Sequence, residues 1–183
     1  MSLVPYPDIE SLPEETRSAI SKMAAPLNIF KMMANAETCF VPLVRLGGTI
    51  LSRQKLAANL REMVILKVAK LSGGEYEWVQ HVPIALAVGV TQAQIDALAQ
   101  GATEAACFSD ADRAVLRFAE EVAQNVKANE VTVREVMKFL SPREIVELIL
   151  AVGFYRTMAC LTETTRVDLD PPMGTKVVDR LRR

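Results

Sequence analysis

Apolar residues recur with a helical spacing along most of this 183-residue chain, and that pattern restricts its fold more than any other feature. The chain has no alternating polar and apolar run bounded by hairpin turns, so no strand is predicted. Glycine, proline and capping residues divide the pattern into about eight helical segments. The sequence therefore predicts an all-α fold.

Start and stop signals place the predicted helices. The first five are expected at about 11–23, 29–33, 36–52, 57–72 and 75–88. Ser11 is the expected cap of the first helix, Pro42 is expected to break or bend the third, and Gly73 is expected to end the fourth. Later helices are expected to start at Thr91, Ser109, Thr132 and Ser141. All of these except Ser109 are followed three residues later by Gln or Glu, as in a capping box.

Composition divides the chain into three parts. We interpret residues 1–27 as an N-terminal arm and first helix, 28–167 as an all-α domain, and 168–183 as a C-terminal arm. The last part contains Pro171 and Pro172 and ends in a segment that carries Arg180, Arg182 and Arg183. This arm is either a frayed terminus or a segment that reaches across a partner subunit.

Charge, histidine and cysteine content exclude several classes of protein. Lys and Arg total 21 and Asp and Glu total 22, so the chain lacks the basic footprint of a nucleic-acid-binding protein. A single histidine excludes zinc sites built from two or three histidines of one chain, and no metal is expected. Cys39, Cys107 and Cys160 form no Cys-x-x-Cys motif. We expect Cys39 and Cys160 to be buried packing thiols.

The chain also shows no sign of a targeting or membrane-spanning segment. Its N-terminal segment lacks the basic and apolar regions of a signal peptide. The longest clean apolar run, 82–90, is too short to span a bilayer. We therefore expect a cytoplasmic protein with neither a membrane nor a nucleic acid as its partner.

Two neighbouring predicted helices carry the residues suited to chemistry. Glu62 lies in an apolar helix, and Glu77 and His81 stand one turn apart on a mostly apolar face of the next. If the helices form a hairpin at Gly73, Glu62 approaches His81. One imidazole and two carboxyl groups in an apolar pocket suit proton transfer near neutral pH. By spacing alone, a packing role for His81 stays open.

Several segments resemble one known family. Arg61-Glu62-Met63, the string Tyr76-Glu77-Trp78-Val79-Gln80-His81, Gly89-Val90-Thr91 and the earlier segment 28–35 are similar to the carboxymuconolactone decarboxylase and alkylhydroperoxidase D-like (AhpD-like) family. The resemblance implies an all-α AhpD-like domain and a homo-oligomer, as a dimer, trimer or hexamer. It also implies an active pocket between the two helices that takes a small-molecule substrate.

The two branches of that family imply different chemistry. In the peroxidase branch, a relay glutamate and a histidine match Glu62 and His81, but the positions of its two redox cysteines hold Gly74 and Glu77 here. The decarboxylase branch acts without a cofactor on a small carboxylated lactone from aromatic catabolism. There His81, Glu62 and Glu77 would be catalytic, and Tyr76 and Trp78 would wall the pocket. The anionic substrate would need a cation, for which the candidates are Arg45, Arg53, Arg61 and Lys67.

Three functions are therefore compatible with the sequence. The first is a cofactor-independent acid/base enzyme, a lyase of the carboxymuconolactone decarboxylase type, that acts on a small organic acid or lactone. The second is a peroxiredoxin-like antioxidant enzyme that reduces hydroperoxides, which would need a reactive cysteine near His81. The third is a non-catalytic oligomeric protein that binds a ligand.

Overall fold

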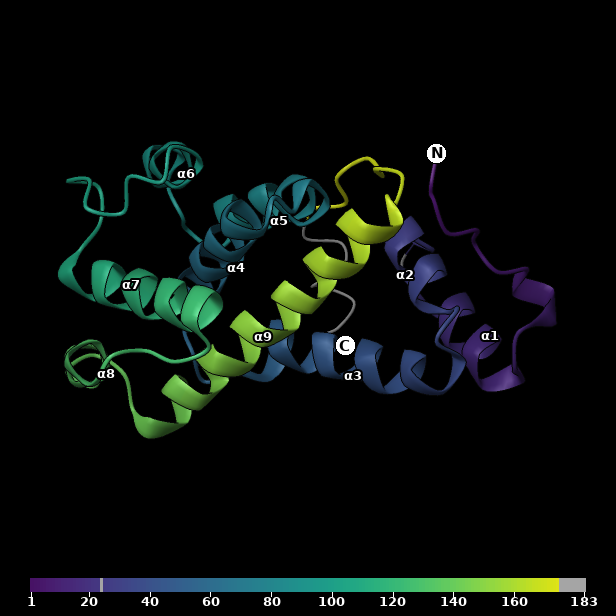
Figure 1. The fold of residues 1–183 in the computed structure, drawn as a ribbon, viewed down its shortest axis with the longest axis horizontal. Coiled ribbons are helices and arrows are strands. Elements are labelled where there is room, and N and C mark those ends of the chain that lie inside the picture. The colour runs from purple at the N-terminus through teal and green to yellow at the C-terminus, as the bar shows by residue number, and fades with distance from the viewer. Residues whose placement is uncertain (24, 175–183) are drawn as a thin grey trace.

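The computed structural model describes residues 1–23 and 25–174 of the chain, and these form an all-α fold (Figure 1). The all-α prediction is confirmed. Within the described residues there are a short 3₁₀ turn and nine α-helices: η1 (Ile9–Ser11), α1 (Glu14–Ser21), α2 (Asn28–Met33), α3 (Glu37–Arg53), α4 (Ala58–Ser72), α5 (Glu75–Ala87), α6 (Gln92–Ala99), α7 (Asp110–Asn125), α8 (Glu130–Val136) and α9 (Pro142–Thr165). The arginines expected in the C-terminal arm lie outside the described residues.

Helix α4 is the centre of the fold. It packs against α5, α6, α7 and α9, and its residues Arg61 to Ala69 are all buried. A helix that is apolar on nearly every side needs neighbours on every side, which explains this position. The helix ends where predicted, because Gly73 adopts a left-handed conformation with φ of 67°. The following helix, α5, therefore starts close to the end of α4.

Helix α9 crosses the molecule diagonally in Figure 1 and packs against α3, α4, α5 and α7. By length and composition alone it could cross a membrane. In this fold one set of its apolar residues, among them Leu148, Val152 and Met158, is buried against the other helices, whereas Val146, Ile149 and Leu150 are exposed. The same test is passed by core helices of soluble proteins, and α9 occupies the position of one.

The predicted helix starts are only partly correct. The capping boxes at Thr91 and Ser141 are present as predicted. The one expected at Thr132 is not, because α8 starts earlier, after Asn129, and the Thr132 hydroxyl donates to Glu121 on α7 instead. Ser11 does not cap α1 either, since η1 and a proline precede that helix.

The expected break of the third helix does not occur, because Pro42 lies inside α3 and does not end it. The burial expected of two cysteines is wrong: Cys39 and Cys160 are exposed, and Cys107 is half-buried. Cys160 follows the buried pair Met158 and Ala159 on α9, and this helix turns it toward solvent.

Residues 168–174 are neither frayed nor extended away from the chain. The carboxylate of Asp170 accepts hydrogen bonds from the Tyr76 hydroxyl (2.5 Å) and from the backbone N–H of Asn28 (2.7 Å). The side chain of Gln80 on α5 donates to the carbonyl of Asp170 and accepts from the N–H of Met173. This segment therefore packs against α2 and α5 of the same chain.

Candidate functional site

Helices α4 and α5 bring Glu62 and His81 together. Oε2 of Glu62 lies 2.8 Å from Nδ1 of His81, and both side chains are buried, with exposures of 0% and 8%. This contact joins residues 19 positions apart, and it depends on the short link at Gly73 that lets the two helices pack side by side. The approach of Glu62 to the single histidine is thus observed.

Arg61 sets the charge of this pair. Its guanidinium is buried, and Nε lies 3.3 Å from Oε1 of Glu62. Arginine stays charged in proteins and only donates, so Oε1 of Glu62 accepts from it, and a carboxylate can only accept hydrogen bonds. The proton in the contact between Glu62 and His81 therefore resides on Nδ1. In a neutral imidazole, Nε2 then carries the lone pair.

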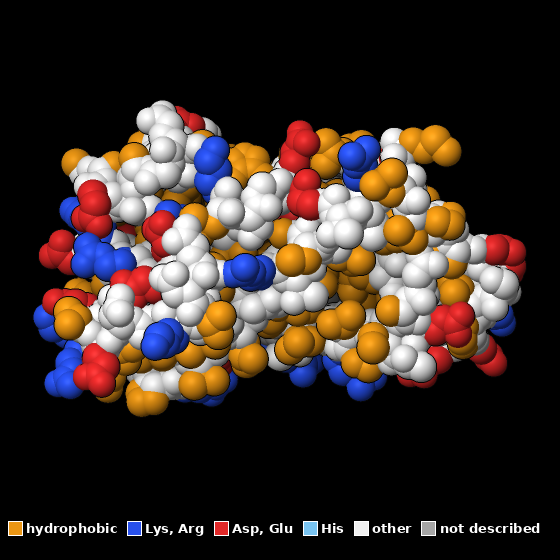
Figure 2. All heavy atoms as spheres, viewed as in Figure 1, with side chains coloured by type: hydrophobic (Ala, Val, Ile, Leu, Met, Phe, Trp, Pro, Cys, Tyr) orange, Lys and Arg blue, Asp and Glu red, His pale blue; other side chains and the backbone are white. Residues whose placement is uncertain are grey.

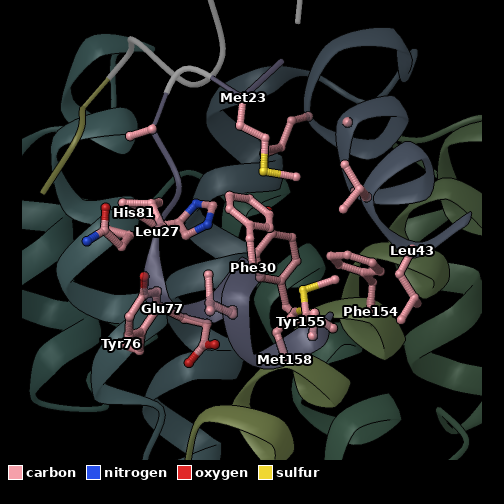
Figure 3. A pocket seen from close by; sticks show the side chains of 18 of the residues that line it. Met23, Leu27, Phe30, Leu43, Tyr76, Glu77, His81, Phe154, Tyr155 and Met158 are labelled. Carbon is pink, nitrogen blue, oxygen red and sulfur yellow. The ribbon is translucent and has the colours of Figure 1, made fainter. Parts of the chain in front are cut away.

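A part-open cavity of about 400 Å³ lies beside His81 (Figure 3). Its walls come from α1, α2, α3, α5 and α9, so residues distant in sequence share one space. Most of the lining is apolar, including Phe30, Leu43, Phe154 and Met158. Since Nδ1 of His81 is occupied by Glu62, Nε2 is the ring nitrogen available to a ligand in this cavity.

Glu77 lines the same cavity but does not hydrogen-bond to His81 among the described residues. Its two carboxyl oxygens each lie 3.2 Å from the hydroxyl of Thr162 on α9. Burial raises the pKa of Glu77, and the Thr162 hydroxyl and the charge of His81 only partly oppose that rise. The Thr162 hydroxyl has one proton but four oxygens within reach: the two of Glu77 and the carbonyls of Met158 and Ala159. It can therefore donate to a carbonyl and accept a hydrogen bond from a protonated Glu77.

Replacing Glu77 with glutamine is expected to stabilise the protein increasingly as pH rises. The folded state has the raised pKa, whereas the unfolded chain ionises near the ordinary value of about 4.3. Wild type therefore has its full stability below that ordinary value, where Glu77 is protonated in both states. It loses stability as pH rises from there through the folded pKa. Glutamine does not ionise, so the variant does not lose this stability. Urea unfolding at several pH values between about 3 and 8 measures the difference.

Glu144→Gln is the matched control, and the opposite trend is expected for it. Hydrogen bonds from the Ser141 hydroxyl and N–H lower the pKa of Glu144, so wild type gains stability as pH rises past the ordinary carboxyl value. This control variant should lose stability relative to wild type over that range. Parallel trends for the two variants would contradict the burial argument for Glu77.

Of the two residues predicted to wall the pocket, Tyr76 lines the cavity and Trp78 does not. Tyr76 lines the cavity, but its hydroxyl donates to Asp170, and burial raises its pKa, so it stays protonated. Trp78 does not line this cavity; it packs against the hydrophobic cluster that α4 and α6 form with residues such as Met63 and Leu98. Each residue advances about 100° around a helix, which carries Trp78 past the face that Glu77 presents to the cavity.

Sequence reasoning did not identify two residues from α9 that shape the site. The ring of Tyr155 meets the His81 ring edge to face, with centroids 4.8 Å apart. Burial and the charge of Glu62 raise the pKa of Tyr155 well above its ordinary value, so it remains a phenol. Thr162 is the partner of Glu77. Both lie in the last long helix, where no motif marks them.

Gly74 and Glu77, which stand where the peroxidase branch has its redox cysteines, are in steric contact. A Cβ atom built on Gly74 would lie 2.7 Å from Oε2 of Glu77 and 3.1 Å from Cβ of Ala159. No side chain therefore fits at Gly74 while Glu77 keeps its place. None of the three cysteines lines the described part of the cavity.

None of the four predicted cations lines the described part of the cavity. Arg45 and Arg53 are exposed, Arg61 is bonded to Glu62, and Lys67 pairs with Glu120 on α7 at 2.9 Å. Among the described lining residues the one lysine or arginine is Lys22, which is exposed at the end of α1. The described residues also contain no group of three or more His, Cys, Asp or Glu placed to hold a metal ion.

Comparisons with known proteins agree with this architecture. Residues 42–121 match the model of the Carboxymuconolactone decarboxylase family. A peroxidase-related protein from Ralstonia eutropha JMP134, described as an alkylhydroperoxidase AhpD core, superposes with a TM-score of 0.78 at 17% identity, covering 100% of this chain and 97% of that one. A peroxidase-related protein from Silicibacter sp. TM1040 gives 0.78 at 16% identity, with coverages of 99% and 96%.

The fold also occurs in a named enzyme. The debrominase Bmp8 superposes with a TM-score of 0.73 at 14% identity, covering 98% of this chain and 97% of that one. No curated protein matches the sequence. The resemblance inferred from the sequence is confirmed, while identities this low establish the fold alone.

Proposed function

We propose that this protein, a member of the carboxymuconolactone decarboxylase family with an AhpD-like fold, is a cofactor-independent acid/base enzyme that acts on a small organic acid or lactone. One observation carries the proposal. The single histidine is held by a buried carboxylate at 2.8 Å and lines a cavity large enough for a small molecule. That arrangement orients the ring and leaves Nε2 to a substrate.

The proposed step is proton transfer at a carbon next to a carbonyl group. Nε2 of His81 takes the proton as the C–H bond breaks, and the electron pair moves into an enolate. The imidazolium that forms is stabilised by the ionised Glu62 through Nδ1. Glu77, which burial keeps protonated to a higher pH than usual, donates a hydrogen bond to the enolate oxygen. The proton then returns from Nε2 to carbon.

A decarboxylation would use the same groups in a different order. Loss of carbon dioxide leaves a carbanion or enolate, and a protonated His81 delivers the proton that completes the product. Glu62 again orients the ring. Both reactions belong to one class, because each depends on proton exchange between carbon and Nε2 of His81.

A panel of lactones and enolisable esters incubated in D₂O tests the proposal. Wild type is expected to exchange hydrogen for deuterium at the carbon next to the carbonyl, which NMR detects. The matched variant Cys39→Ser/Cys107→Ser/Cys160→Ser should exchange at the same rate, because no cysteine lines the described cavity. Hydroperoxide reduction that requires a cysteine, with no exchange on any lactone, would favour the peroxidase reading instead.

The assembly and location of the protein follow from the same proposal. We expect a cytoplasmic homo-oligomer with a small-molecule substrate and no nucleic-acid or membrane partner. Hydrophobic side chains gather near the start of α9 in Figure 2, where Val146, Ile149 and Leu150 are exposed. An apolar surface of this kind is typical of contacts between subunits.

A further inference from the structure

The lining of the cavity restricts the chemistry of its ligand. Apolar side chains from α2, α3 and α9, such as Ile29, Leu43 and Met158, form most of its walls. Its volume of about 400 Å³ corresponds to roughly a dozen water-sized groups at about 30 Å³ each. A polar ligand body would lose its hydrogen bonds to water there without replacement. The body of the ligand is therefore apolar.

The buried end of the cavity disfavours an ionised group. The polar side chains that α5 and α9 contribute to the described lining are Tyr76, Glu77, Gln80, His81 and Tyr155, and the carboxylate of Glu62 contacts the His81 ring. The guanidinium of Arg61 is bonded to Glu62 and does not line the described cavity. An anion beside His81 would lie near a carboxylate, and no lysine or arginine of the described lining lies at that end to balance it. The group that reacts at His81 is therefore uncharged.

The rim of the cavity has the opposite character. Lys22 is exposed and lines the cavity, so it lies where the cavity meets solvent. It belongs to the end of α1, which Figure 1 shows across α2 from α5. No ion pair occupies Lys22 among the described residues. This ammonium can pair with an anionic group that stays in water while the ligand body is buried.

We propose that the substrate of this cavity is an amphiphile: an apolar body, an uncharged reacting group at His81, and one anionic group at Lys22. The reacting group rests on the proposed function, whereas the binding of the body and the anion does not. The inference narrows the small organic acid or lactone to molecules whose charge lies away from the reacting carbonyl. It therefore selects the proton transfer at carbon over the decarboxylation, whose carboxylate would have to lie beside His81. Dianionic substrates are excluded because their second charge would reach the buried end.

Three ten-carbon probes on the full-length protein test this: decanoate, decan-1-ol and decanedioate, measured by calorimetry below their aggregation concentrations. Decanoate and decan-1-ol are expected to bind once per chain, and decanedioate at least about tenfold more weakly, because a buried unpaired carboxylate is costly. Lys22→Ala should weaken decanoate about two- to fivefold, as for an exposed ion pair, and leave decan-1-ol unchanged. Lys127→Ala, at another exposed lysine, should change neither.

Leu43→Trp fills the cavity from α3 and should abolish binding of decanoate and decan-1-ol, with a thermal melt showing that the variant folds. Equal affinity for decanoate and decanedioate overturns the proposal, as does an equal effect of Lys22→Ala on decanoate and decan-1-ol. Binding of decanoate by wild type without His81-dependent exchange would refute the proposed function alone, and exchange without probe binding would refute the amphiphile alone.

Discussion

Replacing His81 with asparagine is expected to lower the rate of deuterium exchange on a lactone substrate by about 10²- to 10⁴-fold, the usual contribution of a general base. Asparagine has no basic nitrogen to take the place of Nε2. The variant should still fold, since the apolar residues around the site remain. Exchange followed by NMR, with circular dichroism as the check on folding, measures the effect.

Trp78→Phe is the matched control for that experiment. It lies on the same helix as His81 but packs toward α4 and α6, outside the described lining of the cavity. Its exchange rate should stay within about twofold of wild type, because surroundings that keep their packing leave the site unmoved. An exchange rate in His81→Asn equal to wild type would remove the histidine from the mechanism.

Replacing Glu62 with leucine is expected to lower the free energy of unfolding by about 3–5 kcal/mol, as for other buried ion pairs that lose one partner. Arg61 would keep its charge in a site where its exposure is 3%. Nη2 of Arg61 already lacks a hydrogen-bond partner among the described residues, so the guanidinium has little else to turn to. Urea unfolding near pH 7 measures the loss.

The double variant Arg61→Leu/Glu62→Leu separates the charge effect from lost packing. It removes both charges, so most of the lost stability should return, since apolar replacements of a buried pair are often neutral. Its exchange activity should not return, because His81 would lack the carboxylate that orients its ring. A double variant as unstable as Glu62→Leu would show that the charge of Arg61 is not the cause.

Local signals in the sequence predicted much of the fold. Helices α4 and α5 lie where glycine stops and periodicity placed them, because the left-handed Gly73 ends α4 by a local rule. Tertiary contacts overrode weaker local signals elsewhere. Thr132 has the pattern of a cap, but a carboxylate from α7 takes its hydroxyl. Pro42 does not stop α3, whose buried residues Phe40 and Ile50 on either side hold the helix in the core.

The candidate site also contains residues that the sequence could predict and residues that only the tertiary structure reveals. Glu62, Glu77 and His81 could be grouped beforehand because one short link joins their helices. The partners from distant parts of the chain could not. Tyr155 reaches His81, and the charge at the rim comes from Lys22 near the other terminus. Neither belongs to a motif, and only the packing of α1, α5 and α9 around one cavity brings them there.

The most direct test of the account uses the fact that the chain has one histidine. Protein labelled with ¹⁵N in histidine gives NMR signals from a single ring, so no assignment is needed. At a pH where the ring signals show a neutral imidazole, we expect a proton on Nδ1, held by Glu62, and a bare Nε2. In Glu62→Gln, that preference for Nδ1 should weaken. A wild-type ring protonated on Nε2, or one averaging between tautomers as in water, would contradict the central claim.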